Sequence, residues 1–105
     1  MPDGDREERE LKIRTVFASA NRKAKAGLAG KGVKLDVGSD ADGAVVTAWV
    51  KGQGRVRVRF SVGEDYSVVA TTGSKRIGGI PNLCDDGIED RIADVIISEV
   101  RKQSG

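Results

Sequence analysis

The chain has 105 residues, which is enough for one domain with a single hydrophobic core and too few for a second one. Hydrophobic residues make up 38% and charged residues 32%, so the chain is polar but still carries enough apolar residues to fold. It has no histidine and one cysteine, Cys84, which excludes an intramolecular disulfide, Cys/His zinc sites and catalysis by a histidine base. We therefore expect residues 1–105 to form a single domain, with residues 1–4 and 102–105 mobile at its ends.

The first ten residues are acidic and polar, whereas a signal peptide starts with basic and then apolar residues. The sequence also lacks a run of about 18 apolar residues, the length that a membrane-spanning helix needs. These two features predict a cytoplasmic protein that does not enter a membrane.

Residues 3–28 show the apolar periodicity of an amphipathic helix. The predicted buried stripe consists of Ile13, Phe17, Ala20, Ala24 and Leu28, with Leu11 and Val16 widening it. Asp3 or Asp5 can cap the start of this helix, and glycines at 27, 30 and 32 are typical of its end. The segment therefore predicts one long helix whose apolar stripe faces the core.

Four segments rich in β-branched residues follow, at 33–37, 44–50, 55–62 and 66–72. The separators are short and rich in Gly and Asp, which favours hairpins and excludes crossover helices. Residues 73–82 contain Lys75 and Arg76 among several glycines and indicate a flexible basic loop rather than a phosphate-binding one.

A second amphipathic helix is predicted near the C-terminus, from apolar residues spaced by three and four. Its stripe consists of Ile88, Ile92, Val95, Ile96 and Val100. Two capping boxes compete for its start, Asn82 with Asp85 and Asp86 with Glu89. The predicted fold is thus α+β with the order α-β-β-β-β-α, a four-stranded antiparallel meander with two helices packed on one face.

Lysine and arginine concentrate in two stretches that contain no acid, residues 11–35 with seven cations and residues 51–59 with four. In the second stretch, Arg55, Arg57 and Arg59 alternate with apolar residues, so their guanidinium groups should share one face of the sheet. Guanidinium groups bind phosphates and carboxylates in a bidentate manner. An ordinary strand with one solvated face shows the same alternation, so this pattern leaves both interpretations open.

The position of Trp49 depends on the length of the turn that follows it. An even loop, with Val50 opposite Arg55, places the indole in the core. An odd loop, with Lys51 opposite Arg55, places it on the arginine face as a stacking platform. Burial is the favoured interpretation, because large aromatic side chains are usually buried.

Two further groups of residues could suggest other chemistry. The acids around Gly43 do not match a calcium loop, since Trp49 occupies the position of the required bidentate glutamate, and they indicate a turn instead. Cys84 lies beside Asp85 and Asp86, which disfavour a thiolate, and acids at this place are typical of helix capping. We therefore expect no enzyme activity, no catalytic residue, no metal and no cofactor.

The charge pattern predicts a small binding module that presents a basic surface, built from the first helix and the third strand, to an anionic partner. Nucleic acid is the partner that such a surface most often binds. The candidate binding residues are Arg22, Lys23, Lys25, Trp49, Arg55, Arg57, Arg59, Lys75 and Arg76. The alternative is a protein-protein interaction domain, an inhibitor or adaptor, that binds an acidic protein surface, either as a monomer or as a homodimer.

Overall fold

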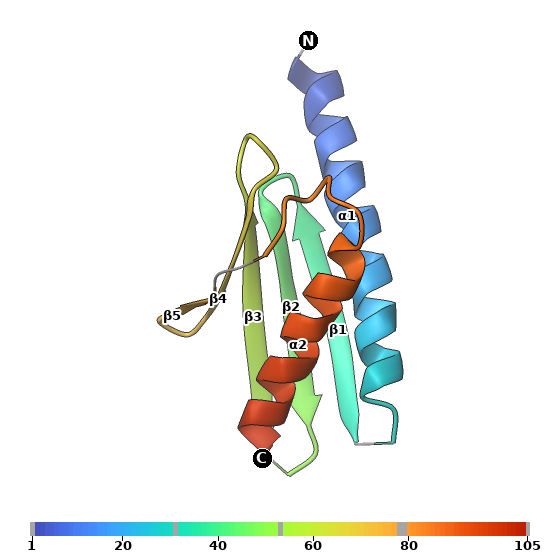
Figure 1. Ribbon diagram of the computed structural model, residues 1–105, viewed down its shortest axis with the longest axis vertical. Coiled ribbons are helices and arrows are strands. Elements are labelled where there is room, and N and C mark those ends of the chain that lie inside the picture. The colour runs from blue at the N-terminus through green and yellow to red at the C-terminus, as the bar shows by residue number, and fades with distance from the viewer. Residues whose placement is uncertain (1, 31, 53, 78–79, 105) are drawn as a thin grey trace.

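A computed structural model describes residues 2–30, 32–52, 54–77 and 80–104, with side chains from 6 to 102. It contains helix α1 (Pro2–Gly27), strands β1 (Val33–Asp40), β2 (Gly43–Val50), β3 (Gly54–Val62), β4 (Val68–Thr72) and β5 (Lys75–Ile77), and helix α2 (Ile88–Ser104). The five strands form one antiparallel sheet in the order β1-β2-β3-β4-β5. Both helices lie side by side on the same face of this sheet (Figure 1).

The α+β class and the antiparallel meander are confirmed, but the sheet has five strands rather than four. The additional strand, β5, forms where the sequence indicated a flexible basic loop. Thr72 pairs with Lys75 across a two-residue turn, in which Gly73 takes a positive φ of 61°. Glycine adopts this backbone conformation without steric cost, so the chain reverses tightly and adds a strand to β4.

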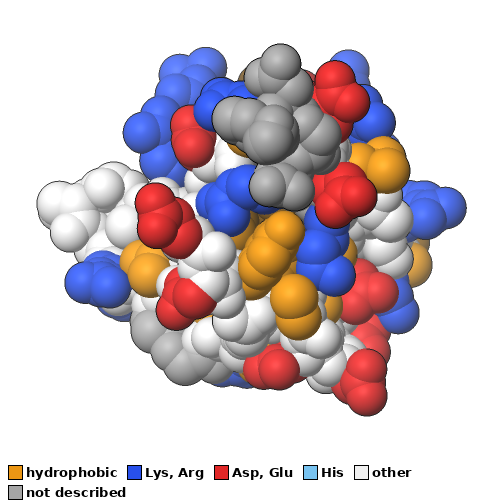
Figure 2. Space-filling model, turned by 90° about the horizontal axis from the view of Figure 1, so that it is seen from above, with side chains coloured by type: hydrophobic (Ala, Val, Ile, Leu, Met, Phe, Trp, Pro, Cys, Tyr) orange, Lys and Arg blue, Asp and Glu red, His pale blue; other side chains and the backbone are white. Residues whose placement is uncertain are grey.

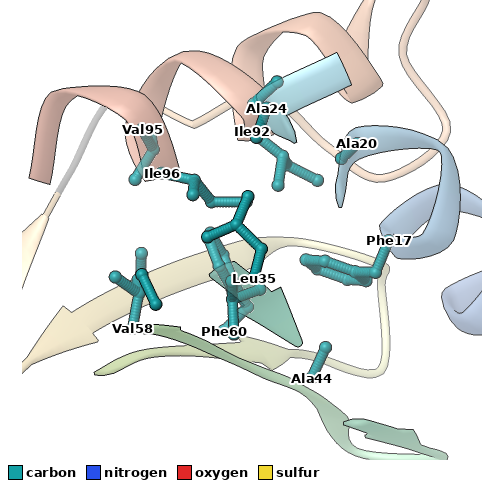
Figure 3. Packing of buried hydrophobic residues seen from close by; sticks show 14 of the residues in the cluster. Phe17, Ala20, Ala24, Leu35, Ala44, Val58, Phe60, Ile92, Val95 and Ile96 are labelled. Carbon is teal, nitrogen blue, oxygen red and sulfur yellow. The ribbon is translucent and has the colours of Figure 1, made fainter. Parts of the chain in front are cut away.

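The core lies between the sheet and the two helices (Figure 3). Every residue of both predicted stripes is buried except the two flanking residues, Leu11 and Val16. Val16 is half-buried against the core, whereas Leu11 is 53% exposed, which makes its predicted place in the stripe wrong. Leu11 precedes Ile13 by two residues, or about 200° around a helix of 3.6 residues per turn, so it lies on the far side of α1.

The turn before α2 resolves the competition between the two capping boxes. The backbone N–H of Asn82 donates to Asp85 Oδ2 at 3.0 Å, and the side-chain Oδ1 of Asn82 accepts from the backbone N–H of Cys84 at 2.9 Å. This first box therefore forms, but it closes a turn that precedes the helix. The helix itself begins at Ile88, and the N–H of Arg91 donates to the carbonyl of Gly87 at 3.1 Å.

One arginine fixes α1 over the ends of three strands. Arg9 Nε donates to the carbonyl of Ala41 at 2.6 Å, and its two terminal nitrogens donate to the carbonyls of Gly63 and Val62. The guanidinium also lies over the ring of Tyr66, 5.5 Å from its centroid. Because these contacts tie α1 to the β1–β2 and β3–β4 turns, they set the position of the helix along the sheet.

The predicted caps Asp3 and Asp5 lie outside the described side chains. The prediction that residues 1–4 and 102–105 are mobile also falls partly outside the described residues and stays a prediction.

Candidate functional site: the open face of the sheet

Neither helix covers the second face of the sheet, which we call the open face (Figure 1). Its residues follow from the strand registers, because side chains alternate between the two faces along each strand. The open face consists of Lys34, Asp36, Gly38, Asp40, Gly43, Val45, Thr47, Trp49, Arg55, Arg57, Arg59, Ser61, Val69, Thr71 and Arg76.

The predicted arginine row runs along β3 on this open face. Arg55, Arg57 and Arg59 are exposed, whereas the alternating residues of β3 point into the core. Successive arginines are two residues apart, a spacing of about 7 Å in an extended strand. Within the described part of the chain, none of the three guanidinium groups makes an ion pair or a hydrogen bond. The row therefore has its hydrogen-bond donors available to a ligand.

Trp49 lies on the open face, with its side chain 41% exposed, so the favoured interpretation of a buried indole is wrong. Val50 pairs with Gly54, which leaves three residues in the turn and places Trp49 directly opposite Arg55. Gly52 and Gly54 have positive φ values of 79° and 100°. These glycines permit the odd turn, and the odd turn reverses the face on which the indole lies.

Lys34 lies on β1 directly opposite Trp49, whereas Arg55 lies opposite Trp49 on β3. Sequence reasoning did not select Lys34 as a site residue, although it counted among the cations of residues 11–35. The alternation of exposed and buried residues in β1 could have found it once its partner in β2 was known. The cross-strand row Lys34, Trp49 and Arg55 thus has an aromatic side chain between two cations.

Two shallow hollows border the cations of the open face, and a further one, lined in part by Asp40, Gly43 and Arg59, lies towards the β1–β2 turn. The first surrounds the indole and is lined by Gly32, Lys34, Trp49, Val50, Lys51, Gly52, Gly54 and Arg55. The second follows the arginine row and is lined by Arg55, Arg57, Arg59, Thr71 and Gly73. Arg55 lines both hollows, so the hollow around the indole and the hollow along β3 are neighbours on the open face.

The charge of the open face is predominantly positive. Its cations are Lys34, Arg55, Arg57, Arg59 and Arg76, and its acids are Asp36 and Asp40. Asp40 is engaged in the β1–β2 turn, where its Oδ1 accepts from the N–H groups of Asp42 and Gly43 at 2.8 and 3.1 Å. This arrangement confirms the predicted turn. It also leaves the acids at the β1 side of the face, away from β5.

The strand β5 separates its two cations. Arg76 pairs with Thr71, which pairs with Arg59, so Arg76 extends the open face. Lys75 is the neighbouring residue of an extended strand and points to the helix side. Of the two, Arg76 is the one that the structure brings to the arginine row.

The structure does not bring the predicted cations of the first helix to the arginine row. Arg22 and Lys25 are exposed on α1, which packs against the other face of the sheet. Lys23 Nζ forms an ion pair with Asp90 Oδ1 at 2.8 Å and so links α1 to α2. The hydrogen bond to Asp90 and the charge of that carboxylate raise the pKa of Lys23 above its ordinary value. The single surface expected from helix and strand is therefore divided between two sides.

At the end of the molecule near the start of α1, cations and acids are intermixed around a small apolar area (Figure 2). Cys84 is exposed, and within the described ranges no three His, Cys, Asp or Glu side chains are grouped to hold a metal ion. None of the described helices is both long enough and apolar enough to cross a membrane.

Comparisons of this chain with protein-family models, with curated proteins and with solved structures give no match. The geometry of the open face is therefore the basis for the function proposed below.

Proposed function

We propose that this protein is a non-enzymatic nucleic-acid-binding module that holds phosphates against the open face of its sheet. The observation that carries the proposal is the exposed row of Arg55, Arg57 and Arg59 along β3, without ion pairs among the described residues. Arginine forks donate to phosphate oxygens in pairs, and each contact also releases counterions from the nucleic acid. The cations of α1 are not part of the proposed site, because α1 lies on the other side of the sheet.

A salt titration with charge-matched variants tests this proposal. One variant replaces the row on β3 (Arg55→Gln, Arg57→Gln, Arg59→Gln), and the control replaces three exposed cations of α1 (Arg14→Gln, Arg22→Gln, Lys25→Gln). Fluorescence anisotropy of labelled single- and double-stranded oligonucleotides gives the affinity from about 50 mM salt upwards, where screening is still modest. The variant of β3 should lower the slope of log affinity against log salt by about 2 to 3, and the control should change it little.

Two outcomes would contradict the proposal. Equal losses in both variants would show that only the total charge matters, and the open face would not be the binding surface. Absence of binding to any DNA or RNA at low salt would exclude nucleic acid and favour an acidic protein surface as the partner.

A further inference from the structure

Trp49 lies between Lys34 and Arg55 on the open face, and phosphate binding does not need its exposed indole ring. The indole is the one large aromatic side chain on the open face. No described ring or cation stacks on it, since the described ring contacts join Phe17 to Phe60 and place Arg9 and Lys12 over Tyr66. An exposed aromatic ring beside cations is the arrangement with which proteins stack unpaired bases. The ring is thus available to a ligand that offers a flat apolar surface and negative charge together.

Building on the proposed function, we propose that the open face binds single-stranded nucleic acid, with one base stacked on Trp49 and the adjoining phosphates on the arginine row. Arg55 lines both the hollow around the indole and the hollow along β3, so the proposed base and backbone sites are adjacent. The arginine row on β3 spans about 13 Å from Arg55 to Arg59 at the rise of an extended strand. A flexible single strand can follow such a straight track while it turns a base towards the ring.

A duplex fits this surface poorly. The major groove admits a helix or a two-stranded ribbon, whereas the open face belongs to a sheet of five strands. The bases of a duplex are also stacked and paired, so an indole on a flat face cannot reach their rings. A duplex could meet the arginines only through the phosphates on its outer surface.

A second copy of the chain is also a poor occupant of the open face. Two open faces packed together would bring the cations of both copies into one interface, with only Asp36 and Asp40 from each copy to oppose them. Polyanion binding, by contrast, is favoured by the same charges.

The experiment uses the full chain and two independent readouts. Trp49 is the only tryptophan, so its intrinsic fluorescence reports directly on the proposed stacking site. Unlabelled dT and U oligomers of about 12 nucleotides are compared with a duplex of the same length and with heparin, a polyanion without bases. We expect the single strands to quench the emission, and the duplex and heparin to leave it nearly unchanged at equal charge.

Anisotropy of fluorescently labelled copies of the same oligonucleotides then measures their affinity for the wild-type protein, Trp49→Leu and Trp49→Phe. The leucine variant should bind the single strand about 5- to 100-fold more weakly, and the phenylalanine variant should recover most of this loss, because it keeps an aromatic ring. Duplex affinity should change less than about twofold, since only phosphates are contacted there. Circular dichroism of both variants confirms that the fold is retained.

The outcomes separate the two proposals. Equal affinity for duplex and single strand, unchanged emission at saturation, or full binding by Trp49→Leu would overturn the single-strand inference and leave the basic surface in place. If the wild-type protein binds none of the nucleic-acid probes, both the proposed function and the single-strand inference are overturned.

Discussion

The two faces of the sheet consist of the same strands but have opposite surroundings. On β3, Val56, Val58 and Phe60 are at most 7% exposed beneath the helices. The arginines that alternate with them, at positions 55, 57 and 59, are exposed on the open face. Alternation along a strand makes both faces at once, and only the helices decide which one becomes the core. Stability and the proposed binding are therefore carried by different side chains of the same strand. Substitutions on one face should therefore leave the property of the other intact.

The largest expected effect comes from the helix-covered face. Phe17 is fully buried, and the centroid of its ring lies 5.0 Å from the ring centroid of Phe60. Phe17→Ala should lower the free energy of unfolding by about 3–5 kcal/mol, because it removes buried apolar surface and leaves a cavity. Urea denaturation measures this change.

A matched substitution on the open face should have little effect on stability. Arg57→Gln should change the free energy of unfolding by no more than about 0.5 kcal/mol, since the side chain is exposed and has no partner among the described residues. Similar losses in Phe17→Ala and Arg57→Gln would contradict the division of roles between the two faces.

The next effect concerns what holds α1 over the covered face. Arg9 donates to three backbone carbonyls, of Ala41, Val62 and Gly63. Arg9→Met keeps the apolar stem but removes these bonds, so we expect a loss of about 2–3 kcal/mol in the free energy of unfolding. The control is Arg14→Met, because Arg14 is exposed on the same helix and makes no described hydrogen bond. If both variants unfold at the same urea concentration, the contacts of Arg9 do not fix the helix.

The smallest expected effect on stability concerns the turn between β3 and β4, which belongs to neither face of the sheet. Hydrogen bonds from the side chain and the backbone N–H of Ser67 lower the pKa of Asp65 below its ordinary value of 3.8. Because the folded pKa is the lower one, this contribution to stability is present above pH 3.8 and is lost as the pH falls through the folded pKa. The effect is small, since the carboxylate is fully exposed.

Carboxyl chemical shifts followed by NMR during an acid titration measure the pKa of Asp65. Ser67→Ala should bring it closer to the ordinary value, because the side-chain hydrogen bond is lost. An unchanged pKa in this variant would show that the Ser67 hydroxyl does not hold the turn.

Some features of the candidate site depended on local pattern, and others on pairing. The alternation of Arg55, Arg57 and Arg59 with apolar residues is a property of one strand, so their shared face was predictable from the sequence. The face of Trp49 depends on how many residues of 51–54 enter the turn, and glycines at 52 and 54 are compatible with either parity. Lys34 joined the site only through its pairing with Trp49 in the neighbouring strand.

The two helices, the antiparallel meander and the buried stripes of the helices, apart from Leu11, were predictable from the sequence, because the periodicity of apolar residues and the lengths of turns are local properties of a chain. The other features depend on contacts between segments that are distant in the sequence. The short strand β5 exists because β4 offers it hydrogen-bonding partners, and Arg9 meets carbonyls that are 32 to 54 residues away in the chain. The cations of α1 and β3 are separated because the apolar stripe of α1 must face the sheet, which turns the arginine row to the opposite side. Such relations join segments distant in the sequence, so no local pattern records them.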